Sequence, residues 1–325
     1  MPKNATSNGR VIVTGATGFV GSYVVREFVS RGVPVIGADL APDPTLLDQL
    51  LTEQERSLVT LETGDIRDRG FVDRLIGLEG VTAVAHLAST LSRSANRNPR
   101  LAIGVVCEGA LNVFDAAVAA GVTRVAWAST AASFGREDDD PTPVPNDAVP
   151  TPTDIYGKAK SLNESIGAYY NRHEGLETVG LRFTVVYGYG RATALARGSA
   201  GGPIVDLIEK PALGEPLDPV RFGDDVMDWL HVTDAARAVY LAATAPHVTS
   251  PGLSVVGHRA TFRQAADEVL AVIPEAGIVV EPGTSPRPLE MNLDGSVTAA
   301  EIGYEPAMDL RSGIRQYIDA VRAHR

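Results

Sequence analysis

The chain has 325 residues, of which 44% are hydrophobic and 21% are charged, so it can bury a large core. Acidic side chains outnumber basic ones by 40 to 29, which gives a formal net charge of -11. A surface this negative repels phosphate backbones, which excludes nucleic-acid binding through a basic face and leaves a small-molecule substrate as the expected partner.

Segments of strand length alternate with segments of helix length as far as Gly188. This alternation predicts an α/β fold with a doubly wound parallel sheet and helices on both faces. Buried-strand patterns occupy residues 10–15, 34–40, 58–66, 81–89, 124–130 and 177–188, and helical patterns occupy residues 18–32, 110–122 and 154–175.

The alternation stops after Gly188. The segment that follows is rich in Gly, Pro and Ala, and a strand and a helix return at residues 228–243. We therefore expect a large domain and a smaller C-terminal lobe. The large domain comprises residues 1–186 and 226–257, and the lobe comprises residues 187–225 and 258–325.

Three features bear on the compartment. Cys107 is the single cysteine, so no disulfide framework forms within the chain, as expected of a reducing cytoplasm. Residues 1–9 are polar and lack the apolar core of a secretory signal. The longest apolar runs have the length of strands, so we expect no membrane span and a cytoplasmic protein.

The segment VIVTGATGFVGSYVV joins the first strand to the first helix through Gly15, Gly18 and Gly21. Glycines at such a junction permit a tight turn, a close approach of the backbone to a pyrophosphate, and tight helix–sheet packing. The helix N-terminus then offers N–H groups to the phosphates. The alternative is a glycine-rich connection that binds nothing, because the spacing is G-x-x-G-x-x-G and such motifs give false positives.

Asp39 favours the dinucleotide interpretation. It ends the second strand run, where a carboxylate accepts hydrogen bonds from an adenosine ribose. A 2′-phosphate at this place would meet like charge, so Asp39 favours NAD over NADP. The alternative is a helix cap or loop aspartate.

Two further strand ends fit a bound dinucleotide. Asp65 and Ile66 follow the third strand, where they can hold an adenine edge and face. Residues Leu87, Ala88 and Ser89 follow the fourth, and their small side chains leave room for the middle of the cofactor. We interpret His86 as a packed strand-end histidine and not as a catalytic residue.

Tyr156 and Lys160 lie four residues apart on the predicted helix 154–175, so they share one face. A free tyrosine has a pKa near 10, and a nearby ammonium or a positively charged nicotinamide lowers it. Tyr156 can then take a proton from a substrate hydroxyl while hydride leaves the same carbon. The alternative is an ordinary surface helix pair.

These residues together resemble the extended short-chain dehydrogenases/reductases, in the NAD-dependent epimerase/dehydratase branch. The resemblance covers nearly the whole chain and rests on motifs in family order. These are TGATGFVG, Asp39, GDI, HLA, ASTAASFG, YGKAK, LRFTVVYGYG and DWLHVTDAARA.

The resemblance implies a Rossmann-type NAD-binding domain with a smaller C-terminal substrate-binding lobe, and a homodimer formed through helices that include the one carrying Tyr156. It implies no metal ligands. The cofactor contacts would be Gly15, Thr17, Gly18, Phe19, Val20, Asp39, Asp65, Ile66, Leu87, Ala88, Tyr156 and Lys160. The substrate contacts would be Ser89, Thr130, Ala131, Tyr156 and Arg191.

The catalytic pair of the family matches Tyr156 and Lys160, with Lys160 also bound to the nicotinamide ribose. The family's catalytic Ser or Thr precedes the motif-closing glycine by five residues, which from Gly135 gives Thr130. Thr130 would orient the substrate oxygen. Ser129 is the lesser candidate because successive strand side chains alternate in direction.

Four positions depart from the family pattern. Ala131 and Ala132 replace the Asp-Glu pair of sugar-nucleotide 4,6-dehydratases, so elimination of water is excluded. Val185 and Val106 replace asparagines of the nucleotide-sugar epimerases, which weakens the case for a nucleotide sugar. Basic candidates for an anionic group remain at Arg191, Arg197, Arg221 and Arg287.

We therefore expect an NAD-dependent oxidoreductase that interconverts a secondary alcohol, such as a sugar or polyol, and its ketone. The alternative is an NAD-dependent sugar or nucleotide-sugar epimerase that oxidises and re-reduces one carbon. A third hypothesis, a non-catalytic NAD sensor, is disfavoured because Thr130, Tyr156 and Lys160 are intact.

Overall fold

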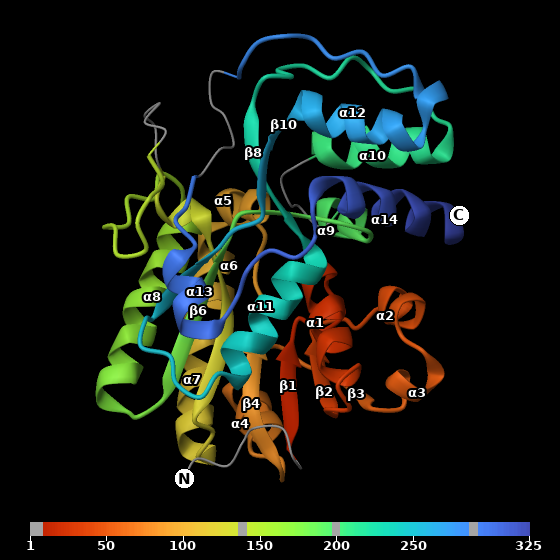
Figure 1. Ribbon diagram of the computed structural model, residues 1–325. Coiled ribbons are helices and arrows are strands. Elements are labelled where there is room, and N and C mark those ends of the chain that lie inside the picture. Colours follow the sequence, from red (N-terminus) through yellow and green to blue (C-terminus); the bar gives the residue numbers. More distant parts are fainter. Residues whose placement is uncertain (1–8, 136–141, 197–201, 286–291) are drawn as a thin grey trace.

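A seven-stranded parallel sheet forms the centre of the computed structural model, which describes residues 9–135, 142–196, 202–285 and 292–325 (Figure 1). Its strand order is β3-β2-β1-β4-β5-β6-β9. All its neighbouring strands pair in parallel, as predicted for a doubly wound fold. The strands are β1 (Arg10–Thr14), β2 (Val35–Asp39), β3 (Val59–Thr63), β4 (Val81–His86), β5 (Arg124–Thr130), β6 (Glu177–Phe183) and β9 (Gly252–Val255).

The strand order reverses between β1 and β4. From β1 the chain builds outward to β3 on one side, and from β4 it builds outward to β9 on the other. Thr14 at the end of β1 is in register with Ala38 of β2 and with His86 of β4. The crevice outside this reversal point is where open α/β sheets bind ligands.

Helices cover both faces of the sheet. On one face α1 (Phe19–Val29) packs against α11 (Val232–Thr244), and their apolar sides share a core cluster with β1. On the other face α4 (Arg69–Ile76), α7 (Gly109–Ala120) and α8 (Ile155–His173) enclose a second cluster. This burial of both faces explains why the strands read as continuous apolar runs.

One continuous helix is longer and more apolar than the sequence analysis predicted, since apolar runs of strand length were expected. It consists of α6 (Pro99–Ala102), a π-helical turn at Ile103–Glu108 and α7. By length and composition Pro99–Ala120 is apolar enough to cross a membrane, but 56% of it is buried inside the fold. Its buried side includes Val113 and Phe114, which belong to the cluster beneath the sheet.

A second, three-stranded sheet with the order β10-β8-β7 lies above the carboxyl ends of the large sheet (Figure 1). Its strands are β7 (Val185–Tyr187), β8 (Val226–His231) and β10 (His258–Thr261), and α10 (Gly202–Leu213), α12 (Phe262–Val272) and α14 (Leu310–Ala323) pack beside it. The remaining elements are α2 (Thr45–Leu50), α3 (Glu53–Arg56), α5 (Ser92–Arg97), α9 (Arg191–Ala196), α13 (Ser296–Ile302) and two 3₁₀ turns, Ala131–Ser133 and Pro274–Ala276.

The sheets divide the chain differently from the predicted domains. The strand run expected at 177–188 breaks at Thr184, where the chain leaves β6 of the large sheet and enters β7 of the small one. β8, expected in the large domain, pairs with β7 and β10. α13, expected in the lobe, packs on β9 and α11 and buries Ile302 in the core of the large sheet.

Candidate active site

A cavity of about 950 Å³ opens at the carboxyl ends of the strands, between the large sheet and the small one. It brings together residues from β1 to β8 that lie far apart in the chain. Of the predicted site residues, the cavity is lined by Gly15, Gly18, Phe19, Val20, Asp39, Asp65, Ile66, Leu87, Ala88, Ser89, Thr130, Ala131, Tyr156, Lys160 and Arg191.

The glycine loop is closely packed against its neighbours. Gly15 has φ +69, and a Cβ there would lie 2.8 Å from the backbone nitrogen of Ala88. A Cβ on Gly21 would lie 1.9 Å from the carbonyl oxygen of Gly15. α1 begins at Phe19 after Gly18, which provides no side-chain cap, so the first-turn N–H groups face the cavity without a local acceptor. This cradle fits a pyrophosphate.

Asp39 is held rigidly at the end of β2. Its Oδ2 accepts hydrogen bonds from the Thr17 backbone nitrogen at 3.2 Å and from the Thr17 hydroxyl at 2.8 Å. Its Oδ1 accepts from the Leu40 nitrogen at 2.9 Å. Thr17 is not among the residues that line the cavity; its buried hydroxyl donates to Asp39 and so orients that carboxylate.

Where Asp65 and Ile66 were predicted to hold an adenine, the structure adds a charged neighbour, Arg67. The carboxylate of Asp65 accepts hydrogen bonds from the guanidinium of Arg67, at 3.0 Å from Nε and 2.5 Å from Nη2. This bond lowers the pKa of Asp65. Arg67 also lines the cavity, beside the buried side chain of Ile66. Sequence reasoning missed Arg67, although it stands only two positions after Asp65.

His86 is a packed strand-end residue, as interpreted from the sequence. Its Nδ1 lies 2.7 Å from the hydroxyl of Thr14, which also accepts a hydrogen bond from the Ala88 nitrogen at 3.2 Å. Burial lowers the pKa of His86 to about 3, so the ring is neutral at physiological pH. It therefore fixes the β1–β4 junction below the cavity.

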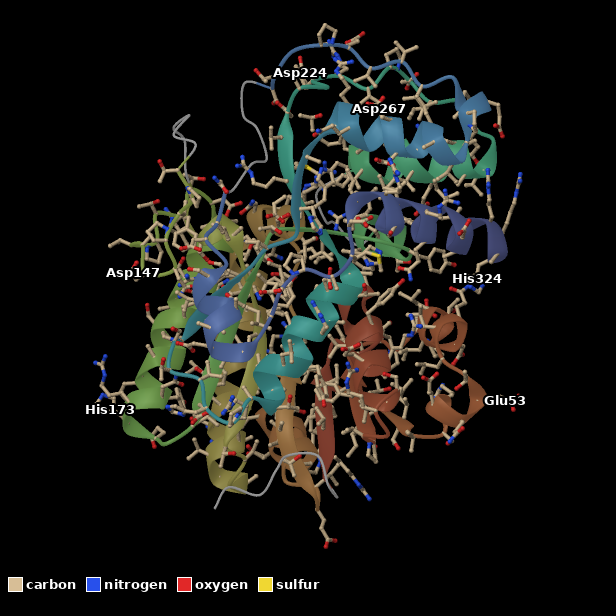
Figure 2. All side chains as sticks on the ribbon, viewed as in Figure 1. Glu53, Asp147, His173, Asp224, Asp267 and His324 are labelled. Carbon is tan, nitrogen blue, oxygen red and sulfur yellow. The ribbon has the colours of Figure 1, made fainter. Side chains whose placement is uncertain are left out.

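Tyr156 and Lys160 project from the first turns of α8. Asp154 caps the helix by accepting a hydrogen bond from the Gly157 nitrogen at 2.8 Å. Asn96 of α5 bridges the same end, donating to Asp154 at 2.8 Å and accepting from the Tyr156 nitrogen at 3.3 Å. The other end of α8, at His173, lies at the far edge of the molecule (Figure 2). Tyr156 and Lys160, the predicted catalytic pair, are thus fixed at the cavity end of the helix.

Burial controls the charges of this pair. Lys160 is 4% exposed, and its Nζ donates a 2.6 Å hydrogen bond to the Ala128 carbonyl of β5. Burial lowers the pKa of Lys160 to about 8. Burial raises the pKa of Tyr156 to about 12, against a lowering effect of its hydrogen bond with Thr130. The expected lowering by Lys160 is not seen, because Nζ lies 5.9 Å from the Tyr156 ring centroid and bonds a carbonyl instead.

Thr130 and Ser129 point in opposite directions, in agreement with strand alternation. The Thr130 hydroxyl accepts a hydrogen bond from the Ala132 nitrogen at 3.2 Å and lies in the cavity wall beside Tyr156. The Ser129 hydroxyl donates at 2.6 Å to the buried carboxylate of Glu164. Thr130 is therefore the hydroxyl placed to contact a substrate oxygen.

Glu164 anchors α8, the helix that carries Tyr156 and Lys160, to the sheet. It lies four residues after Lys160 on the same face of α8 and forms an ion pair with Arg182 of β6, with 2.7 Å between Oε2 and Nη2. Each side chain of the pair is 7% exposed. Because Ser129 donates to the same carboxylate, α8, β5 and β6 are joined directly behind Thr130.

Of the arginines that the sequence offered for binding an anionic group, one lies in the cavity and one lies outside it. Arg191 begins α9 and lines the cavity, with its guanidinium donating to the Val186 carbonyl, and burial lowers its pKa to about 10. Arg221 is exposed and faces Glu281 at 3.6 Å, away from the cavity. Arg197 and Arg287 lie outside the described residues.

Val185 and Val106, the two valines at asparagine positions of the family, lie in different places in the fold. Val185 lines the cavity at the start of β7. Val106 is buried in the π-helical turn, where its carbonyl accepts a hydrogen bond from Asn163 at 2.6 Å. Val106, which was matched to an asparagine position of the nucleotide-sugar epimerases, does not line the cavity, and its side chain packs beside Cys107 and Ala159.

A family model described as "NAD dependent epimerase/dehydratase family" matches residues 11–257. The chain belongs to this family. It is an enzyme of the extended short-chain dehydrogenase/reductase class that uses NAD, and the glycine cradle and Asp39 described above fit that cofactor. When bound, NAD accepts a hydride from a carbon bearing a hydroxyl group and can return it.

The relatives of this family member include nucleotide-sugar enzymes. UDP-glucuronate 4-epimerase 5 of Arabidopsis thaliana is 28% identical over 326 residues, which cover 95% of this chain and 74% of the relative. A solved UDP-glucose 4-epimerase with UDP-glucose from Thermotoga maritima is 25% identical with a TM-score of 0.80, covering 97% of this chain and 99% of that one. The Thermus thermophilus UDP-glucose 4-epimerase in complex with NAD is 25% identical with a TM-score of 0.79, covering 96% and 99%.

These relatives favour the alternative drawn from the sequence, an epimerase, over the net oxidation of an alcohol. They also disfavour the non-catalytic NAD sensor. The polar cavity residues that the sequence reasoning missed include Thr184 and Asp228 as well as Arg67. Asp228 stands within the motif DWLHVTDAARA, but its contact with Thr184 appears only when β7 and β8 pair.

Proposed function

We propose that this enzyme is an NAD-dependent 4-epimerase of a UDP-sugar. The observation that carries the proposal is that the dinucleotide cradle and the Tyr156, Lys160 and Thr130 set share one cavity, in which Ala131 and Ala132 supply no carboxyl group for elimination. The relatives that cover nearly the whole chain are epimerases of this type.

The reaction requires the side chains to move one proton twice. Tyr156 takes the proton from the substrate hydroxyl as hydride leaves the same carbon, and it returns the proton after hydride comes back to the opposite face. Thr130 holds the oxygen through both steps. When NAD is bound, its positively charged nicotinamide ring would favour the phenolate and oppose the effect of burial on the Tyr156 pKa.

Val185 bears on the choice of substrate. It stands where nucleotide-sugar epimerases often carry an asparagine, and it lines the cavity, so it remains a departure that weakens the case for a nucleotide sugar. The Val106 objection falls away, since that side chain is buried elsewhere. The cavity of about 950 Å³ is large enough for a dinucleotide together with a second ligand.

The test combines two assays on one sample. Wild-type protein is incubated with UDP-glucose and separately with UDP-glucuronate, while NMR detects the C4 epimer and absorbance detects reduced NAD. We expect an epimer without net NAD reduction. Net reduction with a ketone product would instead support the oxidoreductase reading from the sequence.

Two tyrosine variants on α8 provide a matched comparison. Tyr156→Phe should lose turnover by at least about 10²-fold and keep its NAD, since only the proton-transferring hydroxyl is removed. Tyr169→Phe, at an exposed position of the same helix, should retain full activity. Retained turnover in the Tyr156 variant would overturn the catalytic assignment.

We also propose that the enzyme is a homodimer. Large apolar side chains are exposed on the two neighbouring helices α7 and α8, at Leu111, Leu162 and Tyr169. In a homodimer formed through these helices, the three side chains would be covered by the partner. Sedimentation of wild-type protein and of the Leu162→Glu variant tests this; a wild-type monomer would refute it.

A further inference from the structure

The hydroxyl of Tyr23 connects α1 with the segment that leads into α9. Tyr23 is 6% exposed, and its Oη donates a 3.1 Å hydrogen bond to the carbonyl oxygen of Tyr189, which lies 166 residues further along the chain. Burial raises the pKa of Tyr23, so the hydroxyl stays a neutral donor. Neither tyrosine lines the cavity, so this contact is made outside it.

Tyr23 is a rigid anchor because α1 packs tightly onto the glycine loop. Gly21, two residues earlier, is so close to that loop that a Cβ there would lie 1.9 Å from the Gly15 carbonyl oxygen. The ring of Tyr23 meets the ring of Phe19 edge to face, with 6.2 Å between the centroids, and Phe19 lines the cavity. The donor is therefore fixed by the same packing that forms the cofactor cradle.

The segment that accepts this hydrogen bond is conformationally permissive. Both neighbours of Tyr189 are glycines with positive φ, +138 at Gly188 and +90 at Gly190. Glycine on each side gives the backbone more freedom than any other residue would. Contacts with other elements must therefore hold residues 188–190 in place.

Two further elements supply such contacts. The Tyr189 hydroxyl donates to Oε1 of Gln49 in α2 at 3.0 Å, and its ring stacks on His324 after α14, with 5.3 Å between the centroids. Gly190 is seated on Leu46 of α2, where a Cβ would lie 2.7 Å from the leucine Cδ2. Figure 1 shows α14 above α1 and α2. Residues 188–190 are thus held between these three helices.

Arg191 follows this segment directly. It begins α9, is 7% exposed and lines the cavity. Its backbone nitrogen donates to the Gly188 carbonyl at 3.2 Å, and its guanidinium donates to the Val186 carbonyl. A displacement of residues 188–190 would therefore move Arg191 relative to the cavity. Fixing the geometry of a guanidinium before a ligand arrives improves its affinity for an anion.

We infer that Tyr23, through the Tyr189 carbonyl, is a positioning residue that holds Arg191 for an anionic group of the substrate. That group is the diphosphate of a nucleotide sugar or the carboxylate of a hexuronate, which both present the oxygen anions that a guanidinium binds. The inference rests on the proposed UDP-sugar epimerase function and adds to it a residue outside the cavity.

Calorimetry in the NAD-loaded Tyr156→Phe background measures binding without turnover. UDP, UDP-glucose and UDP-glucuronate are each titrated with and without Tyr23→Phe. Tyr304→Phe is the matched control, because Tyr304 is 2% exposed, donates to the Val256 carbonyl at 2.8 Å and shares a core cluster with Tyr23, but does not line the cavity. Thermal unfolding confirms that each variant is folded.

Tyr23→Phe should weaken binding by about threefold to tenfold, the effect of one hydrogen bond, while Tyr304→Phe leaves binding within about twofold. With Tyr156 intact, Tyr23→Phe should raise KM by a similar factor and leave kcat and bound NAD unchanged. A loss for all three ligands assigns Arg191 to the diphosphate, and a loss confined to UDP-glucuronate assigns it to the carboxylate.

A double-mutant cycle connects the effect to Arg191. In an Arg191→Met background, Tyr23→Phe should weaken binding by less than about twofold, because no guanidinium is left to position. If Tyr23→Phe does not fold, Tyr189→Phe, which loses the hydrogen bond to Gln49, takes its place in the cycle.

The failure of the inference differs from the failure of the proposed function. If a UDP-sugar binds but Tyr23→Phe behaves as Tyr304→Phe does, or if its effect is equally large with and without Arg191, Tyr23 is only a structural residue and the proposed function stands. If the wild-type enzyme neither binds nor turns over a UDP-sugar, the proposed function fails and the inference fails with it.

Discussion

Replacing Glu164 with glutamine should both destabilise the fold and lower the pKa of Lys160, the proposed catalytic lysine. The carboxylate of Glu164 accepts hydrogen bonds from Arg182 at 3.0 Å and 2.7 Å, and from Ser129 at 2.6 Å. Glutamine keeps the shape but leaves the guanidinium of Arg182 buried without a counter-charge. Removing one partner of a buried ion pair costs about 3–5 kcal/mol.

The matched control is an exposed pair. Arg311 and Glu268 lie 2.8 Å apart, with the arginine side chain 70% exposed. Glu268→Gln should change the free energy of unfolding by less than about 1 kcal/mol. Urea titrations of both variants, compared at equal slope, measure the difference.

Replacing both members of the ion pair tests whether the loss of stability comes from an unpaired buried charge. If the cost in Glu164→Gln comes from an unpaired buried charge, then Glu164→Met combined with Arg182→Met should cost less than the single change. A double variant that is less stable than the single one would contradict this reasoning.

The same change should shift the pH dependence of catalysis. Burial lowers the pKa of Lys160 to about 8, and the thiol of Cys107, when it is ionised, and the carboxylate of Glu164 act in the opposite direction. Without the Glu164 charge the pKa of Lys160 falls further, so the loss of activity on raising the pH should begin at a lower pH. A pH profile of kcat identical to wild type, together with a stability loss below about 1 kcal/mol, would refute the anchoring role of Glu164.

Three further predictions follow from the site. Gly21→Ala places a Cβ 1.9 Å from the Gly15 carbonyl oxygen and should weaken NAD binding by at least about tenfold. Gly70→Ala, where the nearest atom to the new Cβ is 3.4 Å away, should leave NAD binding unchanged. Equal NAD affinities of the two variants would contradict the proposal that the glycine loop holds the pyrophosphate. Asp39→Ser should raise binding of NADP relative to NAD, because it removes the like charge at the 2′-position, and an unchanged preference would exclude that role. Burial lowers the pKa of His86 to about 3, so below about pH 6.5 the unfolded state binds a proton that the folded state does not. The free energy of unfolding should therefore fall by about 1.4 kcal/mol per pH unit as the pH drops from about 6.5 towards about 3. In urea titrations at several pH values, His86→Asn should reduce this slope.

The sequence by itself determined six of the seven strands of the large sheet, all but β9, and much of the site. Strand and helix periods are local, so they fix β1, α1 and α8 and show that Thr130 and Ser129 face opposite ways. Helical spacing places Tyr156 and Lys160 on one face. The order of these motifs along a parallel sheet brings them to one edge, since the carboxyl ends of the strands coincide.

The tertiary structure determined the features that depend on contacts between residues far apart in the chain. The exchange of the chain between two sheets at Thr184 interrupts no hydrophobic pattern, so the sequence reads one strand where there are two. The Tyr156 pKa is raised because burial, a property of the assembled cavity, outweighs its neighbours. Thr184 and Asp228 meet only through the pairing of β7 with β8, and long-range pairing of this kind leaves no trace in the residues on either side.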